Sequence, residues 1–72
     1  RTMTFDIPHW TTPVKRVTVR MRDGGRQCRL PEADSAENLE DAQSGGWYYD
    51  ATRQKLSVKA SMQGAFMSIE IR

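Results

Sequence analysis

The sequence predicts an all-β fold: a small antiparallel β-sandwich of about six strands, either immunoglobulin-like or a partly open barrel. Two observations indicate this fold class. Apolar and polar residues alternate along most of the chain, which is typical of strands with one buried face. Turn-forming residues separate these stretches at short spacing. Because 72 residues leave room for one domain, residues 1–72 are expected to form a single β-sandwich domain.

Three strands are expected in the first half of the chain. Alternation over residues 2–7 predicts the first, and alternation over residues 17–22 predicts the second. Asp23-Gly24-Gly25 follows and favours a tight turn, because glycine accepts positive φ without steric cost. Residues 26–30 then form the returning strand of a hairpin, with Cys28 predicted to face inward.

The second half begins with a different kind of segment. Residues 31–44 are acidic, and Leu39 is their only large apolar residue, so we expect a loop with about one helical turn. Asp34 or Ser35 is the expected helix cap. Three further strands are predicted at residues 47–49, 55–62 and 65–72.

The sequence provides few groups for catalysis or metal binding. Cys28 and His9 are the only cysteine and histidine, which rules out an intrachain disulfide and falls short of a four-ligand zinc site. His9 has no identifiable orienting partner as a general base. Carboxylates on a loop are not fixed across a cleft as glycoside hydrolysis requires. We therefore expect no metal, no cofactor, and no enzymatic activity from this chain by itself.

Charge and hydropathy restrict the partners. The net charge of +2 is too small to indicate nucleic acid by itself. No apolar run is long enough to cross a membrane, and no signal peptide is visible. Strand-like sequence reaches both ends of the chain, which suggests a piece excised from a longer protein. Two charged groups are interpreted as solvated faces of opposite sign, the basic one at Arg16, Arg20, Arg22, Arg26 and Arg29 and the acidic one at Asp34, Glu37, Glu40 and Asp41.

Aromatic side chains are the main candidates for binding, because exposed rings stack on sugars or bases and anchor protein interfaces. Trp47, Tyr48 and Tyr49 are consecutive, so alternate rings face opposite sides of a strand. We interpret Trp47 and Tyr49 as core and Tyr48 as cover for a strand edge. Phe66 is an apolar exception on the polar face of the last strand. The candidate carbohydrate-binding or interface residues are Trp10, Trp47, Tyr48 and Phe66.

Four short segments carry a resemblance to a known family: Phe5-Asp6-Ile7-Pro8, Pro13-Val14-Lys15-Arg16-Val17-Thr18-Val19, Gly46-Trp47-Tyr48-Tyr49-Asp50-Ala51 and Lys55-Leu56-Ser57-Val58-Lys59. They resemble the C-terminal β-domains of glycoside hydrolase family 31, the α-glucosidase and α-xylosidase group. The resemblance spans both halves of the chain and leaves the acidic segment unmatched. It departs at the first hairpin, where Asp23-Gly24-Gly25 replaces the Asn-Gly common in such domains.

The resemblance implies a non-catalytic accessory domain, which packs against a catalytic domain of the same polypeptide and stabilises it. It implies no catalytic residue here, because the family's catalytic carboxylates reside on its barrel. Two alternatives stay open. One is a carbohydrate-binding module that stacks an oligosaccharide on Trp10, Trp47 and Tyr48. The other is a protein- or nucleic-acid-binding β-barrel that uses the arginine cluster.

Overall fold

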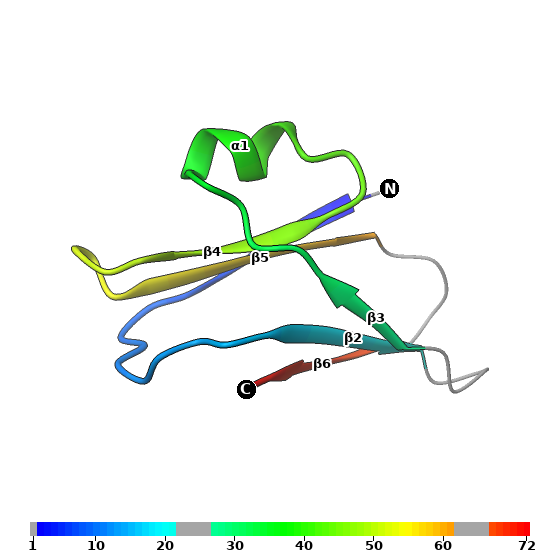
Figure 1. Cartoon of the computed structure of the whole chain (residues 1–72), viewed down its shortest axis with the longest axis horizontal. Coiled ribbons are helices and arrows are strands. Elements are labelled where there is room, and N and C mark those ends of the chain that lie inside the picture. Colours follow the sequence, from blue (N-terminus) through cyan, green and yellow to red (C-terminus); the bar gives the residue numbers. More distant parts are fainter. Residues whose placement is uncertain (1, 22–26, 62–66) are drawn as a thin grey trace.

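The computed structural model describes residues 2–21, 27–61 and 67–72. Their elements follow the chain in the order β1 (Thr2–Ile7), β2 (Val17–Met21), β3 (Gln27–Leu30), α1 (Ala36–Asp41), β4 (Gly46–Asp50), β5 (Lys55–Ser61) and β6 (Met67–Ile71) (Figure 1). The strands form two small antiparallel sheets. The predicted all-β sandwich of six strands is confirmed for the part of the chain that the structure describes.

Each sheet has three strands. Sheet A has the order β1-β5-β4, and sheet B has the order β3-β2-β6. The predicted hairpin is confirmed in its pairing, since β2 and β3 run antiparallel with Val17 opposite Leu30 and Arg20 opposite Gln27. Its turn, at residues 23–25, lies outside the described residues. Two further antiparallel pairings, β1 with β5 and β2 with β6, join segments that are far apart in the sequence.

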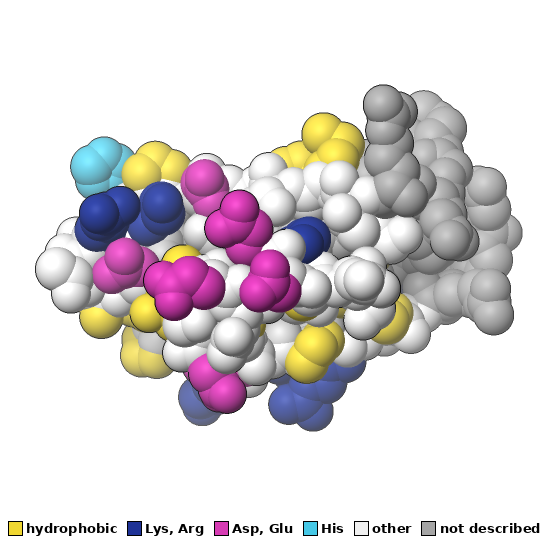
Figure 2. Space-filling model, turned by 90° about the horizontal axis from the view of Figure 1, so that it is seen from above, with side chains coloured by type: hydrophobic (Ala, Val, Ile, Leu, Met, Phe, Trp, Pro, Cys, Tyr) yellow, Lys and Arg dark blue, Asp and Glu magenta, His cyan; other side chains and the backbone are white. Residues whose placement is uncertain are grey.

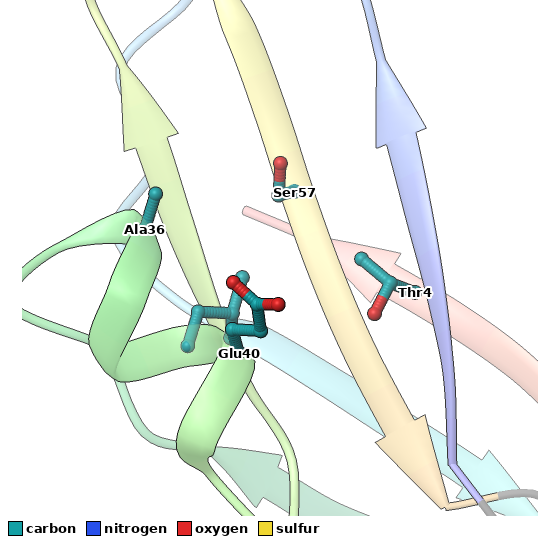
Figure 3. Close-up of a pocket in the computed structure, with 5 residues that line it drawn as sticks. Thr4, Ala36, Glu40 and Ser57 are labelled. Atoms are coloured by element: carbon teal, nitrogen blue, oxygen red, sulfur yellow. The ribbon is translucent and has the colours of Figure 1, made fainter.

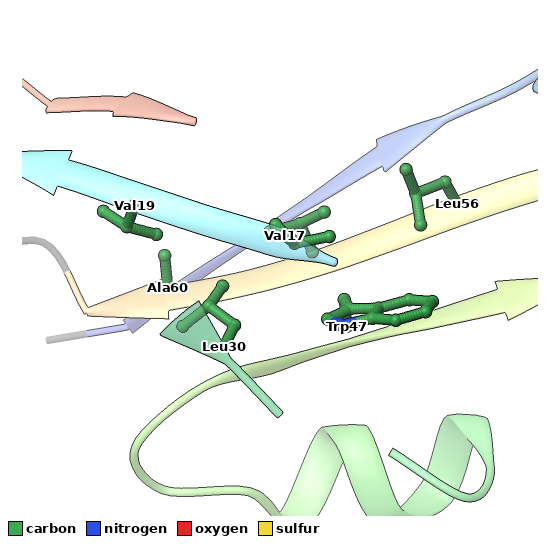
Figure 4. Packing of buried hydrophobic residues seen from close by; sticks show 7 residues of the cluster. Val17, Val19, Leu30, Trp47, Leu56 and Ala60 are labelled. Atoms are coloured by element: carbon green, nitrogen blue, oxygen red, sulfur yellow. The ribbon is translucent and has the colours of Figure 1, made fainter. Parts of the chain in front are cut away.

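The core lies between the two sheets and centres on their middle strands, β5 and β2. Alternation on β5 buries Leu56, Val58 and Ala60 and turns the intervening residues outward. From sheet B, Val17 and Val19 point into the same space, as Figure 4 shows. This period-two burial is what a two-sheet sandwich with polar outer faces requires. The remaining members of the buried cluster are Leu30 and Trp47.

The helix α1 covers part of the outer face of sheet A (Figure 1). Ser35 is its N-cap, because the Oγ of Ser35 accepts a hydrogen bond from the backbone N–H of Asn38 at 3.1 Å. The helix has six residues, slightly more than the single turn expected. Leu39 is its buried residue and packs over Gly46, where a Cβ atom would lie 3.4 Å from the Cδ1 of Leu39. The same Cβ atom would lie 2.9 Å from the carbonyl oxygen of Pro31, so glycine at this position allows the segment before the helix to approach β4 closely.

Cys28 corrects the sequence interpretation. It was expected in the core, but its side chain is exposed. The register places Cys28 opposite the buried Val19, so its inward direction follows the alternation. However, β3 is an edge strand of sheet B and buries only Leu30. Alternation determines which face a residue is on, and the position of its strand in the sheet determines whether that face is covered.

Candidate functional site

Trp47, the first of the predicted ring platforms, lies in the core. Its side chain is only 4% exposed, and it packs in the buried cluster between the sheets. A ring in this position has no free face on which a sugar or a base could stack. The interpretation of Trp47 as core is therefore confirmed, and its use as a binding platform is not compatible with this structure.

Trp10 closes one side of the sandwich. It is half-buried and packs against the core cluster. Its backbone N–H donates to the carbonyl of Gln54 at 2.8 Å, and its carbonyl accepts a hydrogen bond from the hydroxyl of Tyr49 at 2.5 Å. These contacts fix the segment between β1 and β2 to the β4–β5 turn and to β4. The position is that of a structural anchor.

Tyr48 and Phe66 complete the predicted aromatic set. Tyr48 lies on the outer face of sheet A, directly opposite Ser57, and is half-buried. Phe66 lies outside the described residues. The structure therefore does not bring Trp10, Trp47 and Tyr48 together on one surface, since Trp47 and Tyr48 project from opposite faces of β4.

A cavity of about 290 Å³ lies between α1 and the outer face of sheet A. Figure 3 shows the helix residues Ala36 and Glu40 on one side of it and Ser57 and Thr4 from the sheet on the other. The Ser57 hydroxyl is engaged, because it donates to Asp6 at 2.7 Å. Glu40 is the only carboxylate that lines this cavity among the described residues. Two carboxyl groups facing each other, as glycoside hydrolysis needs, are not assembled there.

The outer face of sheet B has a different character. Its side chains line a broad, open hollow of about 480 Å³, which we call the arginine face: Arg16, Thr18, Arg20, Gln27, Arg29, Glu70 and Arg72.

The sheet register explains this gathering of arginines. Thr18 on the central strand β2 lies between Arg29 of β3 and Glu70 of β6. Arg16 and Arg72 exchange two backbone hydrogen bonds, of 3.0 and 2.9 Å, so they lie directly opposite each other. Four guanidinium groups therefore extend from neighbouring positions on one side of the sheet.

One carboxylate lies among these arginines. The Nε of Arg72 donates to the Oε1 of Glu70 at 2.9 Å. This hydrogen bond and the charge of Arg72, with the charges of Arg20 and Arg16, lower the pKa of Glu70 below its ordinary value. Glu70 is therefore ionised at neutral pH, and four arginines with one glutamate leave the face with three net positive charges.

The sequence identified part of this surface. Arg16, Arg20 and Arg29 belong to the predicted basic cluster, whereas the other two members, at positions 22 and 26, lie outside the described residues. Arg72 was missed as a member, because it is remote in sequence from the others. Alternation over the last strand does place Arg72 outward, but only the pairing of β6 with β2 brings it beside Arg16.

The described residues form neither a metal site nor a membrane-spanning helix. Among them, no group of three or more His, Cys, Asp or Glu side chains is placed to hold a metal ion. No described helix is long and apolar enough to cross a membrane.

Comparison with protein-family models, curated proteins and solved structures found no match to this chain.

Proposed function

We propose that this chain is a non-catalytic accessory β-domain of a carbohydrate-active enzyme, which packs against the catalytic domain and stabilises it. The supporting observation is the location of the residues that carry the resemblance to family 31 modules. Val17 and Val19 of the second segment, Trp47 of the third, and Leu56 and Val58 of the fourth are all buried. These residues hold the two sheets together, so the resemblance concerns the residues that make the architecture.

Polar positions of the same segments also serve the fold. The Oδ1 of Asp50 accepts hydrogen bonds from the backbone N–H groups of Thr52 and Arg53, at 3.1 and 3.2 Å. An aspartate that binds the backbone two and three residues ahead shapes a tight turn. Asp50 thus forms the connection between β4 and β5. This structural use of the resembling residues is in keeping with an accessory role.

The geometry favours the accessory role over the carbohydrate-binding module. A stacking site needs exposed ring faces that lie together. Trp47 is in the core, Trp10 is half-buried at the side of the sandwich, and Tyr48 is on the other face of β4. Within the described residues, a carbohydrate-binding module would therefore depend on two half-buried rings, Trp10 and Tyr48.

The proposal is tested on the polypeptide in which this segment occurs. We expect the coding sequence that flanks the segment to encode a catalytic domain in the same reading frame. Deleting residues 1–72 from that protein should lower the melting temperature of the catalytic domain by at least about 3 °C, because packing against a folded neighbour stabilises both. The KM for short substrates should be unchanged. A flank without a catalytic domain, or a deletion without effect on melting, contradicts the proposal.

A titration of the isolated chain separates the two carbohydrate-related readings. An accessory domain should show no amide NMR shift or Trp fluorescence change with a panel of neutral oligosaccharides. Shifts localised to Trp10 or Tyr48 would support the binding module and contradict a purely structural role. Deletion provides a parallel readout, since loss of a binding module raises the KM for polymeric substrates.

A further inference from the structure

The two sheets differ in the type of cation that they present. All four cationic side chains of the arginine face are arginines. The two lysines within described strands, Lys55 and Lys59, both belong to sheet A. A guanidinium group is planar, weakly hydrated and able to bind a carboxylate through two parallel hydrogen bonds, and arginine is enriched at protein interfaces while lysine is depleted. The type of cation on sheet B is thus the type used for recognition.

The arginine face does not serve the stability of the isolated domain. Arg16 and Arg72 are directly opposite each other, and like charges in that position destabilise a sheet. Among the described residues, Arg72 is the one arginine of this face with an ion pair, to Glu70, and both side chains are about half exposed. Exposed pairs of this kind contribute little stability. A concentration of positive charge that the fold itself does not need is best explained by a negatively charged partner.

The other side chains of the face restrict the kind of partner. Apart from Glu70, they are Thr18 and Gln27, which offer hydrogen bonds, and no aromatic residue lines the hollow within the described ranges. Binding of single-stranded nucleic acid depends strongly on stacking of bases on aromatic rings. Three net positive charges also give only weak phosphate binding at physiological salt. A nucleic acid is therefore less well matched to this face than a protein.

The dimensions suit side-chain carboxylates. Strands lie about 5 Å apart and rise about 3.3 Å per residue, so the face is about 10 Å wide and about 13 Å long between positions 16 and 20. Carboxylates one helical turn apart, at about 5–6 Å, are spaced to meet two such arginines. Glu70 shows that a carboxylate fits among them, since its oxygen lies 2.9 Å from the Nε of Arg72.

We propose that the arginine face is a docking surface for an acidic protein surface, one that presents Asp or Glu carboxylates to the four guanidinium groups. The inference deepens the proposed function and rests on it for the identity of the partner, which is the neighbouring domain. In the complex, Arg16, Arg20 and Arg29 bind carboxylates of the partner, while Glu70 competes for Arg72.

The first experiment uses the whole chain and a synthetic helical peptide of 20 residues with glutamates one turn apart; a matched peptide with glutamine at those positions is the control. We expect the acidic peptide to shift amide NMR signals of β2, β3 and β6, and its affinity to fall as salt is raised. Shifts confined to sheet A, or equal binding of the glutamine peptide, would overturn the proposal. Tighter binding of an oligothymidylate of equal charge would assign the face to nucleic acid instead.

Matched variants separate the arginine face from the overall charge. Arg29→Gln and Arg53→Gln each remove one exposed arginine, the first from the face and the second from the β4–β5 turn. We expect Arg29→Gln to weaken peptide binding about three- to tenfold and Arg53→Gln less than about twofold. Glu70→Gln should strengthen binding, because it removes the competing carboxylate. Circular dichroism checks that each variant is folded, and equal losses in the two arginine variants would overturn the proposal.

The outcomes distinguish this inference from the proposed function. If the peptide does not bind but deletion still destabilises a catalytic domain, the accessory role stands and the domain packs through another surface. If the peptide binds at the arginine face but no catalytic domain accompanies the chain, the docking surface stands and the accessory role does not.

Discussion

The outer faces of the two sheets have the same local sequence pattern but different surroundings. On sheet A, α1 lies over the strands, buries Leu39 and takes hydrogen bonds from Lys59. On sheet B, the outward side chains line an open hollow that four arginines dominate. Alternation alone predicts a polar outer face in both cases. The difference comes from a short helix, which is held in place by residues distant in sequence.

The outer faces of the two sheets also differ in charge. Figure 2, viewed toward α1, shows acidic side chains gathered on this side of the molecule. Beneath them, the Nζ of Lys59 donates to the carbonyls of Leu39 and Glu40, at 3.2 and 2.5 Å. These carbonyls belong to the last turn of the helix, where acceptors run short of backbone N–H partners, although the carbonyl of Leu39 also accepts from the N–H of Ala42 at 3.2 Å. Lys59 of sheet A thus stabilises the fold, whereas the arginines of sheet B line an open hollow. Substitutions on the two faces should therefore have different consequences.

The largest effect is expected at the glycine that precedes β4. Gly45 has a φ of 97°, and a Cβ atom there would lie 2.5 Å from the carbonyl oxygen of Lys59. Gly45→Ala combines backbone strain with overlap against a central strand, and should lower the free energy of unfolding by about 2–4 kcal/mol. Urea unfolding measures the change. A loss below about 1 kcal/mol would mean that sheet A does not depend on this close approach.

Removing the helix contact should have the next largest effect. Leu39 is 4% exposed, so Leu39→Ala deletes buried apolar surface and should destabilise the protein by about 2–3 kcal/mol. Arg29→Ala on the open face is the matched surface variant, and its stability should stay within about 0.5 kcal/mol of the parent. Equal losses in urea unfolding for the two variants would remove the distinction between a covered and an open face.

The strands were predictable because their signal is local. Alternation identifies Leu56, Val58 and Ala60 as one buried face without knowledge of the neighbours. The same signal assigned Cys28 to the core, because it cannot tell an edge strand from a central one. Trp10 lies in a loop, as predicted, but local sequence does not reveal that it packs against the core or that its carbonyl binds the hydroxyl of Tyr49, 39 residues away.

The arginine face, too, could be predicted only in part from local sequence. The alternation within each strand predicts that Arg20 and Arg72 each point outward. Their place on one common face depends on the strand order β3-β2-β6, which no local pattern contains. Trp47 shows a related limit: a ring on a strand is equally suited to the core and to binding. Trp47 belongs to the core because the second sheet covers its ring.

A smaller effect is expected from the lysine under α1. Lys59→Met keeps most of the apolar stem but loses both hydrogen bonds to the helix carbonyls, which should cost about 1 kcal/mol. Lys55→Met, on the same face of β5, is the control and should change the free energy of unfolding by less than about 0.5 kcal/mol. Amide hydrogen exchange in residues 39–42 should quicken only in Lys59→Met. Equal exchange in both variants would show that Lys59 does not hold the helix.

The smallest effect concerns pH and the arginine face. The hydrogen bond from Arg72, with the nearby positive charges, lowers the pKa of Glu70 in the folded protein. A lowered pKa means that the ionised form favours the folded state, so this contribution is complete above the ordinary pKa of glutamate and is lost as pH falls through the lowered value. Between pH 6 and pH 3, the urea midpoint of the parent should therefore fall more than that of Glu70→Gln.

The same variant should have opposite effects on folding and docking. At neutral pH, Glu70→Gln removes the carboxylate that offsets the arginines within the described part of the face, so it should lower the urea midpoint slightly while it strengthens binding of the acidic peptide. Parallel pH profiles for parent and variant would show that Glu70 is not coupled to Arg72. A variant that is weaker in both respects would mean that Glu70 orders the face for its partner instead of competing with it.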